Sequence, residues 1–274
     1  MNKMFTAVAV AQLVERGKLS FEDPIGKHLP PGWVTSGVAK KVRIRHLLNH
    51  TSGLGDYLEP VLESAIYKFS NLEDYRDVVA NEPLAFEPGT EWAYSNTGFL
   101  LAGVIVAKVS GMDYFEYVRK NIYEPAGMKN SDHYDHTRPI PELAEGYWTH
   151  EGALRKNTLL LAPRGTSAGG GYSTVNDLLA FDSALRSNKL LGTEMRDRLF
   201  APDPERNSPS YGYGFMVSAL AEDREVGHGG TFPGVSAHLL MFLDSGYTFV
   251  ALCNNDGAGR AYTKAIALIE RMKQ

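Results

Sequence analysis

The stretch "GVSAHLLMFLDSGYTFVALCNN", residues 234–255, decides the fold class. Its two halves are rich in apolar, β-branched and aromatic residues, and Asp244-Ser245-Gly246 between them is typical of a tight turn. We therefore predict two neighbouring antiparallel strands here. The segments "SYGYGFMVSAL" (210–220) and "REVGHGG" (224–230) predict further strands, so the last third of the chain is mainly β.

The rest of the chain predicts mainly helices. Residues 1–16 are apolar nearly all round, which indicates a buried helix that ends at Gly17. Residues 130–165 are expected to be irregular. Further helices are predicted in five segments, which are "NLEDYRDVVANEPL" (71–84, ending before Pro83), "TGFLLAGVIVAKVSG" (97–111), "MDYFEYVRKNIYEPAGM" (112–128), "GGGYSTVNDLLAFDSALRSNKL" (169–190, after a Ser-Thr N-cap region) and "GRAYTKAIALIERMK" (259–273).

Helices first and antiparallel strands last indicate an α+β fold. We expect one domain over 1–274. Its helical region covers about 20–165, and its sheet with flanking helices covers about 1–19 and 166–274.

Composition excludes several classes of protein. The 274 residues are 43% hydrophobic and 22% charged, with a formal net charge of −4, which does not favour a nucleic-acid surface. The longest apolar run, Phe99 to Ala107, is too short to span a bilayer, so no transmembrane segment is expected. Cys253 is the only cysteine and has no internal disulfide partner, and this does not fix the compartment.

Lys3 is the first candidate for chemistry, because it stands at the head of a helix that must be buried. A lysine can take a proton from a nucleophile only if its pKa falls from about 10.4, and burial or nearby cations lower it. The alternative is an ordinary solvated lysine at a helix end.

Tyr94-Ser95-Asn96 precedes the apolar helix and is the second candidate. A phenol near a lysine can act as a general acid or base. The alternative is structural: Tyr94 is a packed ring, and Asn96 or Thr97 caps the helix.

The third candidate is "GHGGTFPG", residues 227–234, with His228. Glycines within a strand often mark the close approach of a backbone or a ligand. Here such an approach would place main-chain N–H groups against a substrate carbonyl. The alternative is a glycine-rich turn with a surface histidine.

Taken together, these stretches resemble the serine β-lactamase and penicillin-binding-protein superfamily, in its branch of class C β-lactamases, D-alanyl-D-alanine carboxypeptidases and esterases. That family has Ser-x-x-Lys on a buried helix, then Tyr-x-Asn, then Lys-Thr-Gly or His-x-Gly on a strand. The segments "RHLLNHTSGL" (45–54) and "SAGGGYSTVNDLLAF" (167–181) are also typical of it. The resemblance covers essentially the whole chain and implies the β-lactamase/transpeptidase-like fold, an antiparallel sheet flanked by helices beside a helical region.

The resemblance also implies roles for individual residues in acyl-enzyme catalysis. Lys3 and Tyr94 would share proton transfer, and Asn96 would orient Lys3 and a substrate amide. His228 would hold substrate or complete the proton network. The strand residues Gly229, Gly230 and Thr231 would bind substrate, with the N–H of Thr231 in the oxyanion hole.

The nucleophilic serine of the family motif falls three residues before Lys3, at the position just before Met1. We therefore expect this chain to lack its nucleophile and two upstream strands, which would pair beside the final strand, 247–255. Another serine is not expected to replace it, because Ser52, Ser95 and Ser167 occupy supporting positions in the family. The exposed sheet edge would make the chain oligomeric, prone to aggregate or completed by another segment.

The stretch "SDHYDH", residues 131–136, has His133 and His136 near Asp132 and Asp135, residue types that can bind a metal. The stretch is polar and irregular, so we expect a solvated loop without metal. The family resemblance implies no cofactor.

The expected substrates are small esters, D-amino-acid peptides or β-lactams. His228-Gly229-Gly230 offers no fixed charge to a β-lactam carboxylate at pH 7, which favours the first two. The competing hypothesis is a non-catalytic binding or scaffold protein on the same fold. The resemblance implies a periplasmic or secreted protein, and the DNA upstream of the Met1 codon would separate these hypotheses most cheaply.

Overall fold

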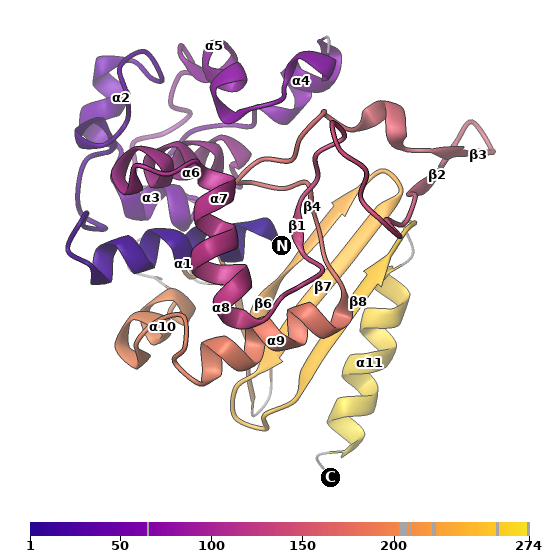
Figure 1. Ribbon diagram of the computed structural model, residues 1–274. Coiled ribbons are helices and arrows are strands. Elements are labelled where there is room, and N and C mark those ends of the chain that lie inside the picture. The colour runs from indigo at the N-terminus through magenta and orange to yellow at the C-terminus, as the bar shows by residue number, and fades with distance from the viewer. Residues whose placement is uncertain (65, 203–207, 209, 221–222, 256–257, 273–274) are drawn as a thin grey trace.

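The computed structural model describes residues 1–274 except 65, 203–207, 209, 221–222, 256–257 and 273–274. Figure 1 shows a group of helices beside an antiparallel sheet. The α-helices are α1 (Asn2–Glu15), α2 (Ser36–Lys41), α3 (Ile44–Leu48), α4 (Leu58–Glu63), α5 (Arg76–Val79), α6 (Asn96–Ser110), α7 (Tyr114–Val118), α8 (Glu124–Ala126), α9 (Val175–Arg186), α10 (Thr193–Phe200) and α11 (Ala258–Met272). The strands are β1 (Asp132–His133), β2 (Tyr147–His150), β3 (Ala153–Lys156), β4 (Gly171–Tyr172), β5 (Met216–Leu220), β6 (Asp223–Phe232), β7 (Val235–Phe242) and β8 (Thr248–Cys253).

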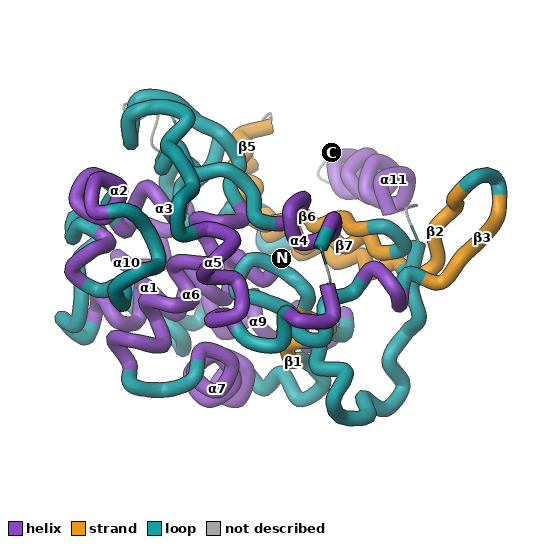
Figure 2. The backbone as a smooth tube through the Cα atoms, turned by 90° about the horizontal axis from the view of Figure 1, so that it is seen from above, coloured by secondary structure: helices purple, strands orange, loops and turns teal. Residues whose placement is uncertain are grey.

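The main sheet has the order β5-β6-β7-β8, and every neighbouring pair is antiparallel. This confirms the predicted run of strands and the turn at 244–246. Helices α9 and α11 both contact β8, and they lie on opposite sides of the sheet (Figure 2). The predicted α+β class, with an antiparallel sheet flanked by helices beside a helical region, is confirmed.

Helix α1 lies at the centre of the molecule. Its residues from Asn2 to Leu13 are all buried, which confirms that an all-round apolar helix needs partners on every side. It packs against α6, α7, α10 and β6. The loop at Gly214 approaches it so closely that a Cβ atom there would meet the Cβ of Ala7 at 2.5 Å, and Gly214 also has φ +77°.

Helix α6 is the second buried helix, and every residue from Thr97 to Val106 is buried. It ends at Gly111, which has φ +72°, as the sequence predicted. Its N-cap is Ser95, whose Oγ accepts from the N–H of Gly98 at 2.9 Å. The structural alternative that Asn96 or Thr97 is the cap is therefore wrong. Because Ser95 provides the cap, the Asn96 side chain is free for other contacts.

Two local predictions need correction. Residues 130–165 were expected to be irregular, but β2 and β3 form a hairpin there, and β1 pairs with β4. These strands have only two to four residues and β3 is fully exposed, so they carry no apolar alternation. The helix predicted over 71–84 is short, with a 3₁₀ turn at Leu72–Tyr75 followed by α5.

The described part of the chain contains no single helix long and apolar enough to cross a membrane. One pair of consecutive helical segments reaches that length and composition when taken together, and it is bent by 80° at the break between Asn96–Ser110 and Tyr114–Ala126.

Candidate functional site

Lys3 stands in the first turn of α1 and is only 3% exposed. Its Nζ donates one hydrogen bond of 2.6 Å to Oδ1 of Asn96 and another of 2.9 Å to the carbonyl of Ala168. The same Nζ lies 4.8 Å from the ring centroid of Tyr94 and 5.4 Å from that of Phe99. The structure therefore brings Lys3, Tyr94 and Asn96 together, although more than 90 residues separate them in the sequence.

The electrostatics of this pocket favour a neutral amine. Burial lowers the pKa of Lys3 from 10.5 to about 7, and the negative charge of Asp56 partly opposes this shift. An amine with this pKa exchanges its proton near neutral pH, which suits a general base.

Asp56 completes the arrangement, although it is not among the site residues predicted from the sequence. Its Oδ2 accepts a 2.6 Å hydrogen bond from Nδ2 of Asn96, so the amide of Asn96 is held at both ends. With Nδ2 bound to a carboxylate, Oδ1 must face Lys3. Asp56 follows the family-like stretch 45–54, but nothing in its local sequence indicates that it meets a side chain 40 residues later.

Tyr94 lies at the surface of the site and is 41% exposed. Burial of its phenol and the charge of Asp56 raise its pKa to about 12, so the phenol keeps its proton at neutral pH. Its ring packs on the imidazole of His50, with the centroids 4.3 Å apart. Nδ1 of His50 accepts the N–H of Ser95 at 3.1 Å, which holds the Tyr94-Ser95-Asn96 loop in place. The predicted alternative of a purely packed ring does not describe Tyr94, whose ring also borders the lysine amine.

The glycines of β6 allow the start of α1 to approach this strand closely. The nitrogen of Met1 lies 3.4 Å from the carbonyl oxygen of Gly229, and a Cβ atom on Gly230 would lie 3.3 Å from that nitrogen. The predicted close approach of a backbone at these glycines is therefore observed. Thr231 follows in the same strand and is exposed, opposite Ser236 of β7.

His228 is not a surface histidine, because it is 2% exposed and both ring nitrogens have partners within the protein. Nδ1 donates to the carbonyl of Gly229, so Nε2 accepts from the hydroxyl of Tyr211 at 2.7 Å. Burial holds the pKa of His228 well below its usual range. Two roles were expected for His228, which were to hold substrate or to complete the proton network. Its burial and its two hydrogen bonds fit a neutral member of the network better than a group that binds substrate directly.

The three serines considered as substitutes for the nucleophile all have structural contacts. Oγ of Ser52 accepts from the N–H of Leu54, and Oγ of Ser167 donates to the carbonyl of Leu100. Oγ of Ser95 caps α6 and donates to the carbonyl of Gly55. All three are buried, which supports the prediction that they serve the fold.

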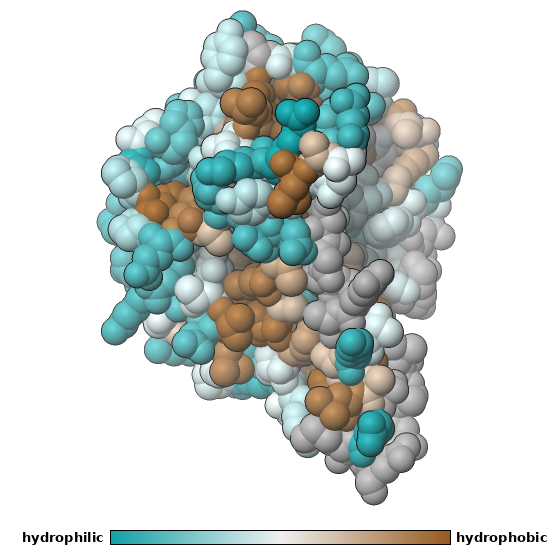
Figure 3. All heavy atoms as spheres, turned by 90° about the vertical axis from the view of Figure 1, so that its right-hand side faces the viewer, coloured by the Kyte–Doolittle hydropathy of each residue, from teal (hydrophilic) through white to brown (hydrophobic). Residues whose placement is uncertain are grey.

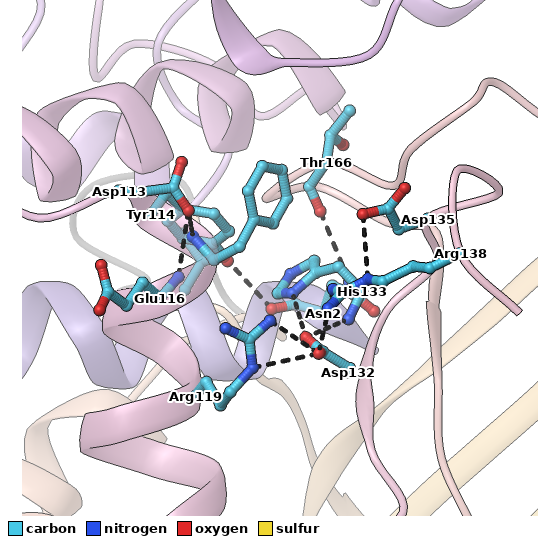
Figure 4. A network of polar contacts seen from close by, with 12 residues as sticks. Asn2, Asp113, Tyr114, Glu116, Arg119, Asp132, His133, Asp135, Arg138 and Thr166 are labelled. Atoms are coloured by element: carbon cyan, nitrogen blue, oxygen red, sulfur yellow. Dashed lines mark hydrogen bonds and ion pairs between the residues drawn. The ribbon is translucent and has the colours of Figure 1, made fainter. Parts of the chain in front are cut away.

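The prediction of a solvated loop at 131–136 is wrong for His133 and Asp132. His133 is buried against the rings of Tyr114 and Phe115. Asp132 accepts two hydrogen bonds from Arg119, and Figure 4 shows these residues pointing toward one another beside Asn2. Across the residues that the structure describes, no group of His, Cys, Asp or Glu side chains is arranged to hold a metal ion.

The family described as Beta-lactamase matches residues 1–271. Penicillin-binding protein 4* of Bacillus subtilis (strain 168) is 32% identical, over 93% of this chain and 60% of that protein. Esterase EstB of Burkholderia gladioli is 28% identical, over 98% of this chain and 79% of that protein. The chain thus spans less than two thirds of the first of these relatives.

Solved structures show the same likeness. A penicillin binding protein from Bacillus halodurans has a TM-score of 0.87 at 32% identity, covering 97% of this chain and 83% of that one. A D-stereospecific amidohydrolase from Streptomyces sp. has a TM-score of 0.80 at 28% identity, covering 93% and 80%. An octameric penicillin-binding protein homologue from Pyrococcus abyssi has a TM-score of 0.82 at 27% identity, covering 100% and 65%.

The buried amine of Lys3 yields a prediction that needs no catalysis. NMR of protein labelled in its lysine side chains should show one amine titrating near pH 7, and this signal should be absent in Lys3→Met. Because the folded pKa is lowered, the unfolded chain binds more protons between pH 7 and about 10.5. The stability of the wild type relative to Lys3→Met should therefore rise with pH across this window.

The neighbouring charge provides the control. Asp56→Asn keeps an oxygen for Asn96 but removes the charge that raises the pKa of Lys3, so the titration should move to lower pH. A Lys3 amine that titrates near 10.5 in the wild type would contradict this description of the site.

Proposed function

The chain belongs to the beta-lactamase family, and from this premise we propose that it forms the body of a serine hydrolase that works through an acyl-enzyme. The observation that carries the proposal is the amine of Lys3, which has a pKa of about 7 and is held by hydrogen bonds to Asn96 and Ala168 at the head of a buried helix. A base in this position can activate a hydroxyl placed one helical turn earlier.

The nucleophile of the proposed enzyme is a serine at the position before Met1, which lies outside these 274 residues. A residue there would be bonded to the Met1 nitrogen, which already lies beside Gly229 and Gly230 of β6. Its hydroxyl would therefore be close to both the Lys3 amine and the next residue of the strand, Thr231. This placement supports an oxyanion hole formed by the N–H of Thr231 and that of the serine itself.

The proposed reaction has two steps. In the first, the serine hydroxyl gives its proton to the neutral Lys3 amine while its oxygen forms a bond to the substrate carbonyl carbon. The leaving group then departs with a proton, for which the protonated Lys3 and the phenol of Tyr94 are the donors at hand. In the second, water attacks the acyl-serine ester, the serine oxygen recovers its proton, and the acid product leaves.

Among substrates, we propose esters and D-amino-acid derivatives ahead of β-lactams. His228 is neutral, buried and committed to Tyr211 and Gly229, so it offers no charge to a β-lactam carboxylate. Two relatives are named as an esterase and a D-stereospecific amidohydrolase, which supports the first two substrate classes, while two others are named as penicillin-binding proteins.

The 274 residues by themselves are proposed to have little or no acyl-transfer activity, because the three candidate serines are buried and engaged elsewhere. A non-catalytic binding protein on the same fold is the alternative. A serine placed before Met1 distinguishes these two functions, because it should create turnover if the protein is a hydrolase and none if it is a binding protein.

The test compares this chain with an extended protein, in which the reading frame is continued upstream of Met1 and serine precedes Met1. The extended protein should hydrolyse short p-nitrophenyl esters faster than nitrocefin, and its matched variant with alanine at that position should lose at least 10⁴-fold in rate. Burst kinetics and mass spectrometry of the acyl adduct would measure this. Equal turnover by the serine and alanine proteins, or faster cephalosporin than ester hydrolysis, would contradict the proposal.

Tyr94→Phe in the extended protein separates proton transfer from packing. The ring is kept and only the hydroxyl is lost, so the rate should fall by roughly 10²-fold or more while the fold is unchanged. An unchanged rate would remove Tyr94 from the mechanism.

We also propose that copies of this chain associate through the β8 side of the sheet. In the described residues β8 is the last strand of the sheet, and it pairs only with β7. Val175 and Leu179 of α9, which packs against β8, are exposed, and Figure 3 shows apolar patches on the face that carries β8 and α11. A homologue from Pyrococcus abyssi is octameric, which supports self-association in general and says nothing of the β8 edge.

Light scattering and hydrogen exchange test this association. Light scattering should give a particle mass above that of a monomer. The substitution Leu179→Lys should lower this particle mass and speed the hydrogen exchange of the amides across 248–253. The control Leu159→Lys changes a leucine that is 90% exposed elsewhere and should have no effect. A wild-type monomer whose β8 amides exchange as slowly as those of β7 would disprove the interface.

A further inference from the structure

His50 has an unusual backbone conformation for a residue with a large side chain. It follows the end of α3, where the N–H of Thr51 donates a 3.1 Å hydrogen bond back to the carbonyl of His46, and its φ is +62°. Helices that end in this way usually have glycine at the left-handed position, because a side chain there is strained. Such strain persists only where other contacts of the residue compensate for it, and it is common at functional sites.

The contacts of His50 converge on Tyr94. The carbonyl of His50 accepts the N–H of Ala93 at 3.0 Å, and Nδ1 of its ring accepts the N–H of Ser95 at 3.1 Å. Both residues that flank Tyr94 are thus hydrogen-bonded to His50. The imidazole also packs on the Tyr94 ring, with the centroids 4.3 Å apart and the planes tilted by 34°. One fully buried residue therefore holds both the backbone and the ring of Tyr94.

Two further rings hold the imidazole in place. Its centroid lies 4.6 Å from that of Tyr211 and 5.3 Å from that of Phe99 in α6, and both of these residues are buried. The hydroxyl of Tyr211 donates a 2.7 Å hydrogen bond to Nε2 of His228 in β6. Because Tyr211 is bound to the sheet and Phe99 is part of a buried helix, the imidazole has little freedom to move away from Tyr94.

The protonation state of His50 follows from the same contacts. A ring nitrogen that accepts a hydrogen bond carries no proton, so the neutral ring has its proton on Nε2. Burial, together with the positive charge of Lys3, holds the pKa of His50 well below its usual range, which keeps the ring neutral. Within the described residues Nε2 has no hydrogen-bond partner, so the imidazole directs its hydrogen bonding to Ser95.

We infer that His50 is a positioning residue, which holds the Tyr94 phenol beside the Lys3 amine for proton transfer. It acts through Tyr94 and transfers no proton itself, because its basic nitrogen is engaged with Ser95. A displacement of a catalytic group by about 1 Å can lower a rate by about 10²-fold, so the placement of the phenol matters. The inference rests on the proposed function, since it assumes that Tyr94 takes part in proton transfer.

A double-mutant cycle in the extended protein tests whether His50 acts through Tyr94. His50→Ala should lower kcat by about tenfold or more and change KM less, because the phenol is misplaced while the substrate contacts remain. In the Tyr94→Phe background the hydroxyl is already absent, so His50→Ala should lower kcat further by no more than about twofold. A merely structural role for His50 predicts the same loss of kcat in both backgrounds.

A rescue variant and a control accompany the cycle. Asparagine tolerates the left-handed backbone and carries an acceptor oxygen where histidine has Nδ1, but it has no ring. His50→Asn should therefore recover part of the kcat that His50→Ala loses. The control is His46→Ala, which removes another buried histidine, one whose Nδ1 accepts the N–H of Arg43. It should lower the melting temperature and leave kcat unchanged.

Two measurements on the 274-residue chain need no nucleophile. Histidine ¹⁵N NMR near neutral pH should show His50 with its proton on Nε2 and none on Nδ1. Crystal structures should show the Tyr94 ring displaced in His50→Ala and unmoved in His46→Ala, where the wild type has 4.8 Å between the ring centroid and Nζ of Lys3. If His50→Ala does not fold, His50→Asn replaces it in both experiments.

Three results would overturn the inference: a proton on Nδ1 of His50, a Tyr94 ring that keeps its place without the imidazole, or losses of kcat that are additive. An active extended protein in which Tyr94→Phe has no effect would overturn it as well. An inactive extended protein would instead reject the proposed function. The tautomer and the ring position would then still decide whether His50 places Tyr94.

Discussion

The burial of one lysine amine is the constraint on which this arrangement depends. An ammonium group removed from water is strongly destabilised unless it is neutralised or given partners. Both conditions hold for Lys3, since its pKa falls to about 7 and its Nζ donates hydrogen bonds to Asn96 and Ala168. The amide of Asn96 must in turn face the right way, and Asp56 fixes it. Capping of α6 by Ser95 leaves Asn96 free for this task.

Strand β6 contributes to the site through two glycines, whose lack of side chains leaves room for α1. Gly229 and Gly230 let the start of α1 reach the backbone of β6, which a side chain at Gly230 would crowd. The same strand continues to Thr231 and Phe232, which border an apolar groove of about 430 Å³. One strand thus places the helix that carries the base, the proposed oxyanion donor and the wall of this groove next to each other.

The sequence predicted the features that depend on local pattern or on family motifs. The two buried helices, the final strands and the trio of Lys3, Tyr94 and Asn96 belong to this group, and the contacts agree with them. Asp56 could not be found in this way, because its role arises only when its loop meets the start of α6. His133 was misjudged for a related reason: its neighbours in sequence are polar, but its partners in space are the aromatic rings of α7.

The proposed function depends above all on activation by Lys3 of a serine placed just before Met1, and a covalent probe would detect such a serine. The extended protein would be treated with a p-nitrophenyl phosphonate, which transfers its phosphonyl group to an activated serine and releases p-nitrophenol, and the modified peptide would be mapped by mass spectrometry. We expect a single adduct, on the serine before Met1, that forms far more slowly in Lys3→Met. An adduct on Ser52, Ser95 or Ser167, or one that forms equally fast without Lys3, would contradict it.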